Sequence, residues 1–275
     1  MLGAIYGDIV GSVYEFNNIR TKNFELFSEK SKFTDDTVMT LAVANALLIF
    51  NETTSADNLI DAPCENNLNY FKEILINEMH RLGKLYLDAG YGVRFFFWLM
   101  KNNKEPYGSY GNGSAMRVSP VAWYANSLEE AVDFAQASAE VTHNHPEGIK
   151  GAVCTAGATY LARTGATMDE IKAFVGEHYK IDFTLDEIRS TYQFNETCQD
   201  TVPQAMQAFF ESNSFDDAIR NAISIGGDSD TLAAITGAVA EAYYGMTERE
   251  VRSVADRLDS TLLNVLNDFR NRFIK

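Results

Sequence analysis

The chain has 275 residues and a formal net charge of −15, with 46% hydrophobic and 22% charged residues, as in ordinary globular proteins. Its acidity argues against nonspecific binding to nucleic acid, which needs basic side chains against phosphates. Cys64, Cys154 and Cys198 lie far apart, so neither a disulfide framework nor a cysteine zinc site is indicated. The sequence contains no secretory leader and no apolar run long enough to span a membrane, and we therefore expect a cytoplasmic protein.

Helical patterns dominate the chain, and strand-like alternation is scarce. Acidic residues begin several apolar, alanine-rich segments, as is typical of a first helical turn, and the apolar positions then recur at close to 3.6 residues. The ranges predicted to be helical are 35–50, 128–141, 148–161, 197–210, 215–223, 231–244 and 247–273. No linker-like run divides the chain. We predict one all-α domain over residues 1–275, a compact bundle of many helices packed at varied angles.

The first segment that differs from routine helix packing is GDIVGSVYEF, from Gly7 to Phe16. Its small residues would let another backbone approach closely. Glu15 follows this apolar, glycine-containing stretch, so it could lie at a helix end facing a cleft. The alternative is a solvated surface carboxylate, which is what most glutamates are.

Two acid-rich helix starts form a pair: Thr34-Asp35-Asp36-Thr37 and Gly226-Gly227-Asp228-Ser229-Asp230-Thr231. Each alone is compatible with ordinary helix capping. Brought together, their four carboxylates and two hydroxyls would repel one another unless cations lay between them. Such hard oxygen ligands suit Mg²⁺ or Mn²⁺, and six of them could hold two ions about 3.5–4 Å apart. The pair therefore favours a metal site.

A glycine-rich segment runs from Tyr107 to Arg117, YGSYGNGSAMR. Its glycines, at 108, 111 and 113, would leave backbone amides free to point at an anion, as in phosphate-binding loops. Tyr110 offers a flat face to a base. The alternative is a simple glycine-rich turn.

Two histidines, His143 and His145, lie in the segment THNHPE. No third nitrogen or sulfur ligand is near them in sequence, so a hydrogen-bonding role at a cleft edge is favoured over zinc.

Taken in this order, the segments resemble the ADP-ribosylglycohydrolase family, which includes dinitrogenase-reductase-activating glycohydrolases and ADP-ribosylserine hydrolases. The motifs GDxxGSxYE, TDDT, GSYGNGSAMR, TH and GGDSDT carry the resemblance, which spans Gly3 to Gly245. It implies a compact orthogonal helical bundle whose central cleft holds two Mg²⁺ or Mn²⁺ ions.

The resemblance also implies roles for individual residues. Both helix starts would supply metal ligands, namely Thr34, Asp35, Asp36, Asp228, Asp230 and Thr231. ADP-ribose would lie against Ser109, Tyr110, Gly111, Asn112 and His143, with loop amides at the diphosphate and Tyr110 stacked on adenine. Glu15 matches the proposed catalytic carboxylate, and Asp36 is counted as catalytic with it.

The chain departs from the serine-hydrolase branch in one place. That branch has a phenylalanine shortly before the glycine-rich loop, which brackets adenine. Here the stretch reads Asn102-Asn103-Lys104-Glu105, and Tyr107 is closer to the loop. The segment 16–33, which helps to cover the site in this family, does not indicate a substrate type.

The activity implied is metal-dependent hydrolysis of the glycosidic bond at C1″ of ADP-ribose. The substrate would be an ADP-ribosylated protein or a small ADP-ribosyl compound, with no nucleic-acid or membrane partner and a monomeric or weakly oligomeric enzyme. One alternative is a non-catalytic ADP-ribose-binding protein, which the intact acidic motifs disfavour; another is a hydrolase of a small free ADP-ribosyl metabolite. The leaving group (arginine, serine, a nucleobase or a small molecule) and the choice between Mg²⁺ and Mn²⁺ stay open.

Overall fold

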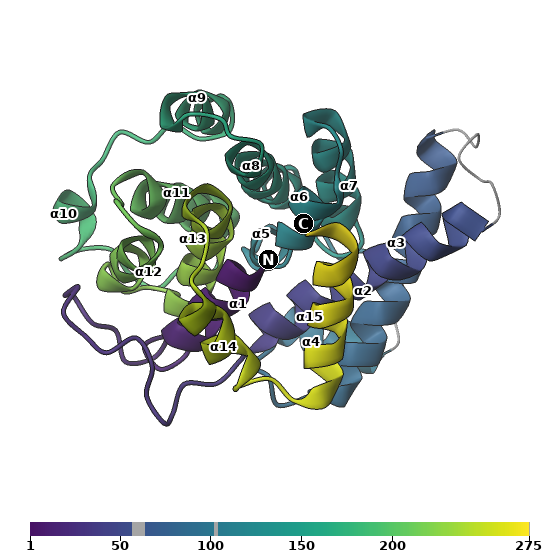
Figure 1. The fold of residues 1–275 in the computed structure, drawn as a ribbon, viewed down its shortest axis with the longest axis horizontal. Helices are drawn as coiled ribbons and strands as arrows, with labels where there is room; N and C mark the ends of the chain where they lie inside the picture. The colour runs from purple at the N-terminus through teal and green to yellow at the C-terminus, as the bar shows by residue number, and fades with distance from the viewer. Residues whose placement is uncertain (57–63, 102–103, 275) are drawn as a thin grey trace.

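A computed structural model describes residues 1–56, 64–101 and 104–274, and these form helices with no β-strand (Figure 1). Their one β-like feature is an isolated antiparallel bridge between Gly111 and Thr197. The helices are α1 (Leu2–Gly11), α2 (Asp35–Ala56), α3 (Cys64–Leu85), α4 (Val93–Met100), α5 (Gly113–Met116), α6 (Ser119–Tyr124), α7 (Leu128–Glu140), α8 (Pro146–Arg163), α9 (Met168–His178), α10 (Leu185–Ile188), η2 (Cys198–Asp200, a 3₁₀ turn), α11 (Val202–Phe210), α12 (Phe215–Ser224), α13 (Ser229–Tyr244), α14 (Glu248–Ala255) and α15 (Ser260–Phe273). The all-α prediction is confirmed.

Two predicted helices are each divided in the structure. The range 247–273 forms α14 and α15, because Asp259 caps a new helix by accepting bonds from the Thr261 and Leu262 amides, at 2.9 and 3.1 Å. The range 197–210 forms η2 and α11. Pro203 stands in the first turn of α11, where the missing N–H of proline costs no helical hydrogen bond. Local signals thus overrode a continuous apolar pattern in both places, a side-chain cap at Asp259 and a proline in the first turn at Pro203.

The glycines of α1 bring that helix into backbone contact with α13. A Cβ on Gly3 would lie 2.1 Å from the Gly237 carbonyl oxygen, and one on Gly7 would lie 2.0 Å from that of Ala233. A third position, Gly11, meets the start of α13 in the same way. The close approach expected for small residues is therefore confirmed, and it places α1 directly beside the first turn of α13.

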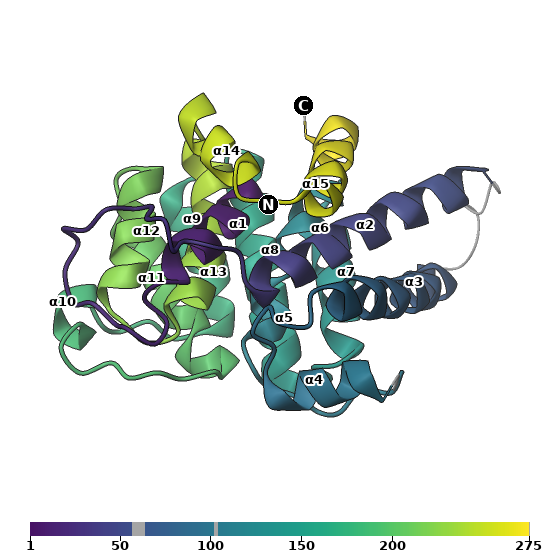
Figure 2. The ribbon, with the colours of Figure 1, turned by 90° about the horizontal axis from the view of Figure 1, so that it is seen from below.

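Helix α13 is buried on all sides from Ser229 to Glu241, which is the pattern of a central helix. Figure 2 shows α14 and α15 on one side of the bundle and α4 on the opposite side. The start of α2 lies against α1, so the two acid-rich helix starts meet inside the bundle. Among the described helices, none has both the length and the apolar character needed to cross a bilayer.

Candidate active site

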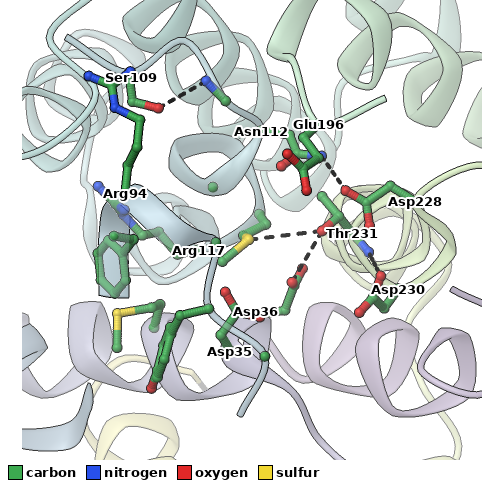
Figure 3. Close-up of a pocket in the computed structure, with 18 of the residues that line it drawn as sticks. Asp35, Asp36, Arg94, Ser109, Asn112, Arg117, Glu196, Asp228, Asp230 and Thr231 are labelled. Carbon is green, nitrogen blue, oxygen red and sulfur yellow. Dashed lines mark hydrogen bonds between the residues drawn. The ribbon is translucent and has the colours of Figure 1, made fainter. Parts of the chain in front are cut away.

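A cavity of about 470 Å³ opens where the starts of α2 and α13 meet the loop before α5 (Figure 3). Most of the predicted site residues line it: Glu15, Asp35, Asp36, Ser109, Gly111, Asn112, His143, Asp228, Asp230 and Thr231. Thr34 and Tyr110 do not border it. The structure thus brings together five segments that are far apart in the sequence.

The start of α2 is held in place by Asp8, a fully buried residue of α1. The Asp8 carboxylate accepts bonds from the Thr34 amide and hydroxyl, at 2.9 and 2.7 Å, and from the Thr37 amide at 3.1 Å and the Thr37 hydroxyl. Burial raises the Asp8 pKa to about 6, while these four bonds act to lower it. Sequence reasoning did not select Asp8, although a single charge inside an apolar helix indicates a buried group that needs partners.

Thr34 performs the capping role that the simpler interpretation gave it. Its hydroxyl accepts a bond from the Asp36 amide at 3.3 Å and lies 3.5 Å from Asp230 Oδ2. The hydroxyl therefore stands between the two helix starts, although it does not reach the cavity surface.

The turn before α13 depends on two consecutive glycines, Gly226 and Gly227, whose φ angles of 70° and 77° lie in the left-handed region. Asn18 binds both sides of this turn. Its Oδ1 accepts from the Gly227 amide at 2.8 Å, while its Nδ2 donates to the Gly227 and Tyr14 carbonyls, at 2.9 and 2.7 Å. These bonds hold the segment that carries Glu15 against the start of α13.

The floor of the cavity is a cluster of buried carboxylates. Asp36 Oδ2 accepts a bond from the Thr231 hydroxyl at 3.1 Å, and Asp228 accepts one from Asn112 Nδ2 at 2.7 Å. Asp36 Oδ1 is buried without a hydrogen-bond partner. Glu15, Asp228 and Asp230 each place a carboxylate oxygen within 4.8 Å of the other two.

Burial and mutual repulsion dominate the electrostatics of this floor. Desolvation first, and the neighbouring acids second, raise the pKa values of Asp36 and Asp230 well above the ordinary range. Burial raises the Asp228 pKa to about 6; burial, followed by the charges of Asp230 and Asp8, raises that of Glu15 to about 8. Glu15 is half-buried and lines the cavity, so it is not a fully solvated surface carboxylate.

These acids have the chemistry of a divalent-cation site. Several carboxylates converge in a buried space, and one oxygen of Asp36 has no donor to neutralise it. Hard oxygen ligands of this kind match Mg²⁺ or Mn²⁺, and a cation would relieve both the repulsion and the missing hydrogen bond. The donor set thus fits the predicted metals.

Backbone amides of the glycine-rich loop are bonded within the protein, contrary to expectation. The amides of Gly108 and Gly111 were expected to be free, but they donate to Asn144 Oδ1 at 2.8 Å and to Ser109 Oγ at 3.2 Å. The Asn112 amide donates to the Glu196 carbonyl at 2.7 Å. Protein acceptors inside and outside the loop satisfy these three donors, and so the amide expectation fails at positions 108 and 111.

Positive charge reaches the cavity instead through two arginines, Arg94 and Arg117, which both line it. Arg117 is buried, and its Nη2 donates to the Ser138 carbonyl and the Thr142 hydroxyl, at 2.9 and 2.8 Å. The guanidinium of Arg94 lies 4.9 Å from the centre of the Tyr107 ring. Neither arginine was selected as a site residue from the sequence, although Arg117 ends the glycine-rich motif.

His143 is buried beside this wall, and its Nδ1 lies 2.7 Å from the Thr142 hydroxyl. Burial first, and then the charges of Arg117 and Arg94, lower its pKa well below the usual value, so the ring is neutral at pH 7. In the described part of the chain, no metal-ligating group of three includes His143 or His145. This agrees with a hydrogen-bonding role.

The predicted adenine contacts lie at the edge of the site. Tyr110 is 44% exposed, and its ring centre lies 5.2 Å from that of His145. Tyr107 lines the cavity. Asn102 and Asn103 lie outside the described residues. Three further lining residues were not selected from the sequence: Phe16, Phe194 and Glu196.

Comparisons with known proteins agree with this architecture. The profile of the family described as ADP-ribosylglycohydrolase matches residues 1–271. A solved structure described as an ADP-ribosylglycohydrolase-related protein complex superposes with a TM-score of 0.66 at 19% identity, covering 99% of this chain and 97% of that one. This likeness shows a shared fold.

Characterised relatives are similar over most of their length. ADP-ribosylhydrolase ARH3 from Homo sapiens is 27% identical, covering 90% of this chain and 85% of its own. ADP-ribosylarginine hydrolase Tri1 from Pseudomonas putida is 28% identical, covering 90% and 70%. ADP-ribosyl-[dinitrogen reductase] glycohydrolase from Rhodospirillum rubrum is 27% identical, covering 94% and 93%. With the family profile matching nearly its whole length, the chain belongs to the ADP-ribosylglycohydrolase family.

Proposed function

We propose that this protein hydrolyses the glycosidic bond at C1″ of ADP-ribose, releasing ADP-ribose from a modified protein or a small-molecule acceptor. The observation that carries the proposal is the buried carboxylate cluster with Glu15 at its edge, on the floor of a cavity large enough for a ligand. Membership of the family, and relatives named as ADP-ribosyl hydrolases, support the same reaction.

The proposed cofactor is a pair of Mg²⁺ or Mn²⁺ ions. Asp36, Asp228 and Asp230 would be the main ligands, and Asp35 and Thr231 also line the cavity. Thr34 would join them only by turning its hydroxyl away from Asp8. Bound there, the cations would supply Lewis-acid chemistry at the ribose hydroxyls and a fixed position for water. Asn112 would keep the Asp228 carboxylate turned toward them through the 2.7 Å bond already described.

Proton transfer is assigned to Glu15. Its carboxylate borders the cavity beside Asp230, and its raised pKa, about 8, is typical of an acid–base group. The bond at C1″ should break through an oxocarbenium-like state, and Glu15 would exchange a proton with the attacking water or with the leaving group.

The diphosphate is assigned to the opposite wall. Arg94 and Arg117 carry the positive charge there, and neutral His143 can offer a hydrogen bond without adding charge. This arrangement would orient the ligand with its phosphates at the arginines and its distal ribose at the acids.

The decisive test is ADP-ribose release from a panel of substrates with arginine, serine or nucleic-acid linkages, in the presence of Mg²⁺ or Mn²⁺. Release that disappears in the Asp36→Ala, Asp228→Ala double variant would support the proposal. If no substrate is cleaved but calorimetry shows tight ADP-ribose binding, the protein is a binding module and the proposal of catalysis fails.

A further inference from the structure

Two exposed aromatic rings stand at the edge of the cavity. Phe16 is 84% exposed and Phe194 is 42% exposed, and both border the space. Their ring centres are 6.2 Å apart with planes inclined by 25°, so the two rings are nearly parallel. They come from segments 178 residues apart, which the fold brings together at this rim. Neither ring belongs to the hydrophobic core, and both side chains are accessible at the cavity.

A carboxylate accompanies the aromatic pair. Glu196 follows Phe194 by two residues, lines the same cavity and has an exposed side chain. Its charge acts with those of Asp230 and Asp8 to raise the pKa of Glu15, and both carboxylates border the same cavity. No ion pair engages Glu196 among the residues that the structure describes. Lys32 acts on Glu15 in the opposite sense but does not border the cavity.

The position of Phe16, Phe194 and Glu196 indicates which part of a substrate these side chains would contact. Phe16 is adjacent in sequence to Glu15, whereas Arg94 and Arg117 occupy the wall assigned to the diphosphate. If C1″ lies at Glu15 and the phosphates lie at the arginines, the atoms beyond C1″ extend toward Phe16 and Phe194. This step rests on the proposed function.

We infer that Phe16, Phe194 and Glu196 form the leaving-group subsite, and that this subsite takes a guanidinium. A guanidinium is a planar, delocalised cation that stacks on aromatic faces and pairs with a carboxylate through two N–H donors. A serine hydroxyl is small and neutral and would use neither feature. A nucleobase could stack, but it would gain nothing from the carboxylate, and the net charge of −15 opposes a nucleic-acid substrate.

The reaction at this subsite is a balanced hydrolysis. The oxygen of water bonds to C1″, and the bond from C1″ to the guanidinium nitrogen breaks. One proton of the water passes to that nitrogen, so a free guanidinium leaves, and the other stays on the new C1″ hydroxyl. No oxidant or further reactant is needed.

The test compares one peptide sequence carrying ADP-ribose on arginine or on serine, together with ADP-ribosylated free arginine. For the wild type, we expect kcat/KM to be at least tenfold higher for the arginine-linked than for the serine-linked peptide. Phe194→Ala should lower kcat/KM on arginine linkages about threefold to tenfold, and Glu196→Gln about tenfold, mainly through KM. Both variants should change the serine-linked rate less than about twofold and leave ADP-ribose affinity unchanged.

Matched controls are available at exposed positions that do not line the cavity. Phe97→Ala removes a phenylalanine that is 53% exposed on α4 and does not line the cavity, and Glu129→Gln removes an exposed acid in the first turn of α7. Neither should alter the preference between linkages. Methylguanidine should inhibit the wild type as a leaving-group mimic and should inhibit Glu196→Gln more weakly.

The possible outcomes distinguish a failure of the guanidinium assignment from a failure of the proposed hydrolysis. Cleavage of the serine-linked peptide at least as fast as the arginine-linked one would overturn the guanidinium assignment while leaving the hydrolase intact. A parallel loss on both linkages in Glu196→Gln would also overturn it, because an effect passed through Glu15 is shared by all substrates. No release from any substrate would instead count against the proposed function. Similar rates on free arginine and on the peptide would support a small guanidino substrate, and a clear peptide advantage would support a protein substrate.

Discussion

The two walls of the cavity differ in how far the protein satisfies its own polar groups. On the acidic floor, Asp36, Asp228 and Asp230 repel one another, and Asp36 Oδ1 has no partner. On the opposite wall, the Thr142 hydroxyl joins His143 and Arg117, and three loop amides, at positions 108, 111 and 112, have protein acceptors. The floor gathers several acids with no positive partner among the described residues, whereas the wall keeps most of its polar groups bonded and leaves Arg117 Nε as a buried donor without a partner. Substitutions on the floor should therefore affect function and metal-dependent stability most strongly.

The largest expected effect is that of Glu15→Gln. Removing a proton-transfer group typically costs about 100- to 10,000-fold in rate, while the amide keeps the size of the side chain. The kcat of the arginine-linked substrate should fall in this range, with metal affinity measured in parallel by calorimetry. A variant that binds two metal ions and keeps full activity would remove Glu15 from the mechanism.

Asp8→Asn tests whether the floor depends on its support from α1. An amide accepts through one oxygen only, so some of the bonds from Thr34 and Thr37 would be lost and the start of α2 would loosen. We expect Mg²⁺ affinity to fall about 10- to 100-fold, as for other groups that orient metal ligands. Thr37→Val, which removes a single hydroxyl donor, should give a smaller change, and equal effects of the two variants would contradict the model of a shared clamp.

The cluster of unpaired carboxylates predicts that the metal-free protein loses stability as the pH rises, and that bound metal offsets this loss. Folding raises the pKa values of Asp228 and Glu15 to about 6 and about 8, so the stabilisation of the protonated forms is lost as pH rises through these values. The loss due to Asp228 is nearly complete at pH 6.5, so between pH 6.5 and 8.5 the Tm of the metal-free protein should fall mainly through Glu15 and level off above about pH 8. Mg²⁺ at a hundred times its Kd should add about 2.7 kcal/mol to the free energy of unfolding. The gain should be greater at pH 8.5, and a Tm independent of both pH and Mg²⁺ would argue against a metal site.

The smallest effect on stability is expected for a substitution on the wall that carries Arg94 and Arg117. Arg94 is exposed, so Arg94→Ala should change the free energy of unfolding by less than about 0.5 kcal/mol. ADP-ribose affinity should nevertheless fall about threefold to tenfold, since a charge-assisted bond to phosphate would be lost. Calorimetry with ADP-ribose measures this loss, and unchanged affinity would place the diphosphate elsewhere.

The sequence by itself determined the helical class, and most of the site residues that it indicated do line the cavity. Apolar periodicity and acidic first turns indicate α2, α7, α12 and α13 locally, because these signals lie within a few residues of one another. The ordered motifs then indicated Glu15 and the paired aspartates. Helix ends were less predictable, since the cap at Asp259 competes with an apolar pattern that continues through it.

Only the tertiary structure decided which of these groups meet and which partners they have. The buried bonds of Asp8 and the pairing of Phe16 with Phe194 join residues from distant parts of the chain, and no local pattern encodes such contacts. The same holds for the pKa of Glu15, which depends on burial and on charges brought in by α1 and α13. Helix periodicity and capping are short-range properties, whereas desolvation and electrostatic repulsion depend on distances that exist only after the helices have packed.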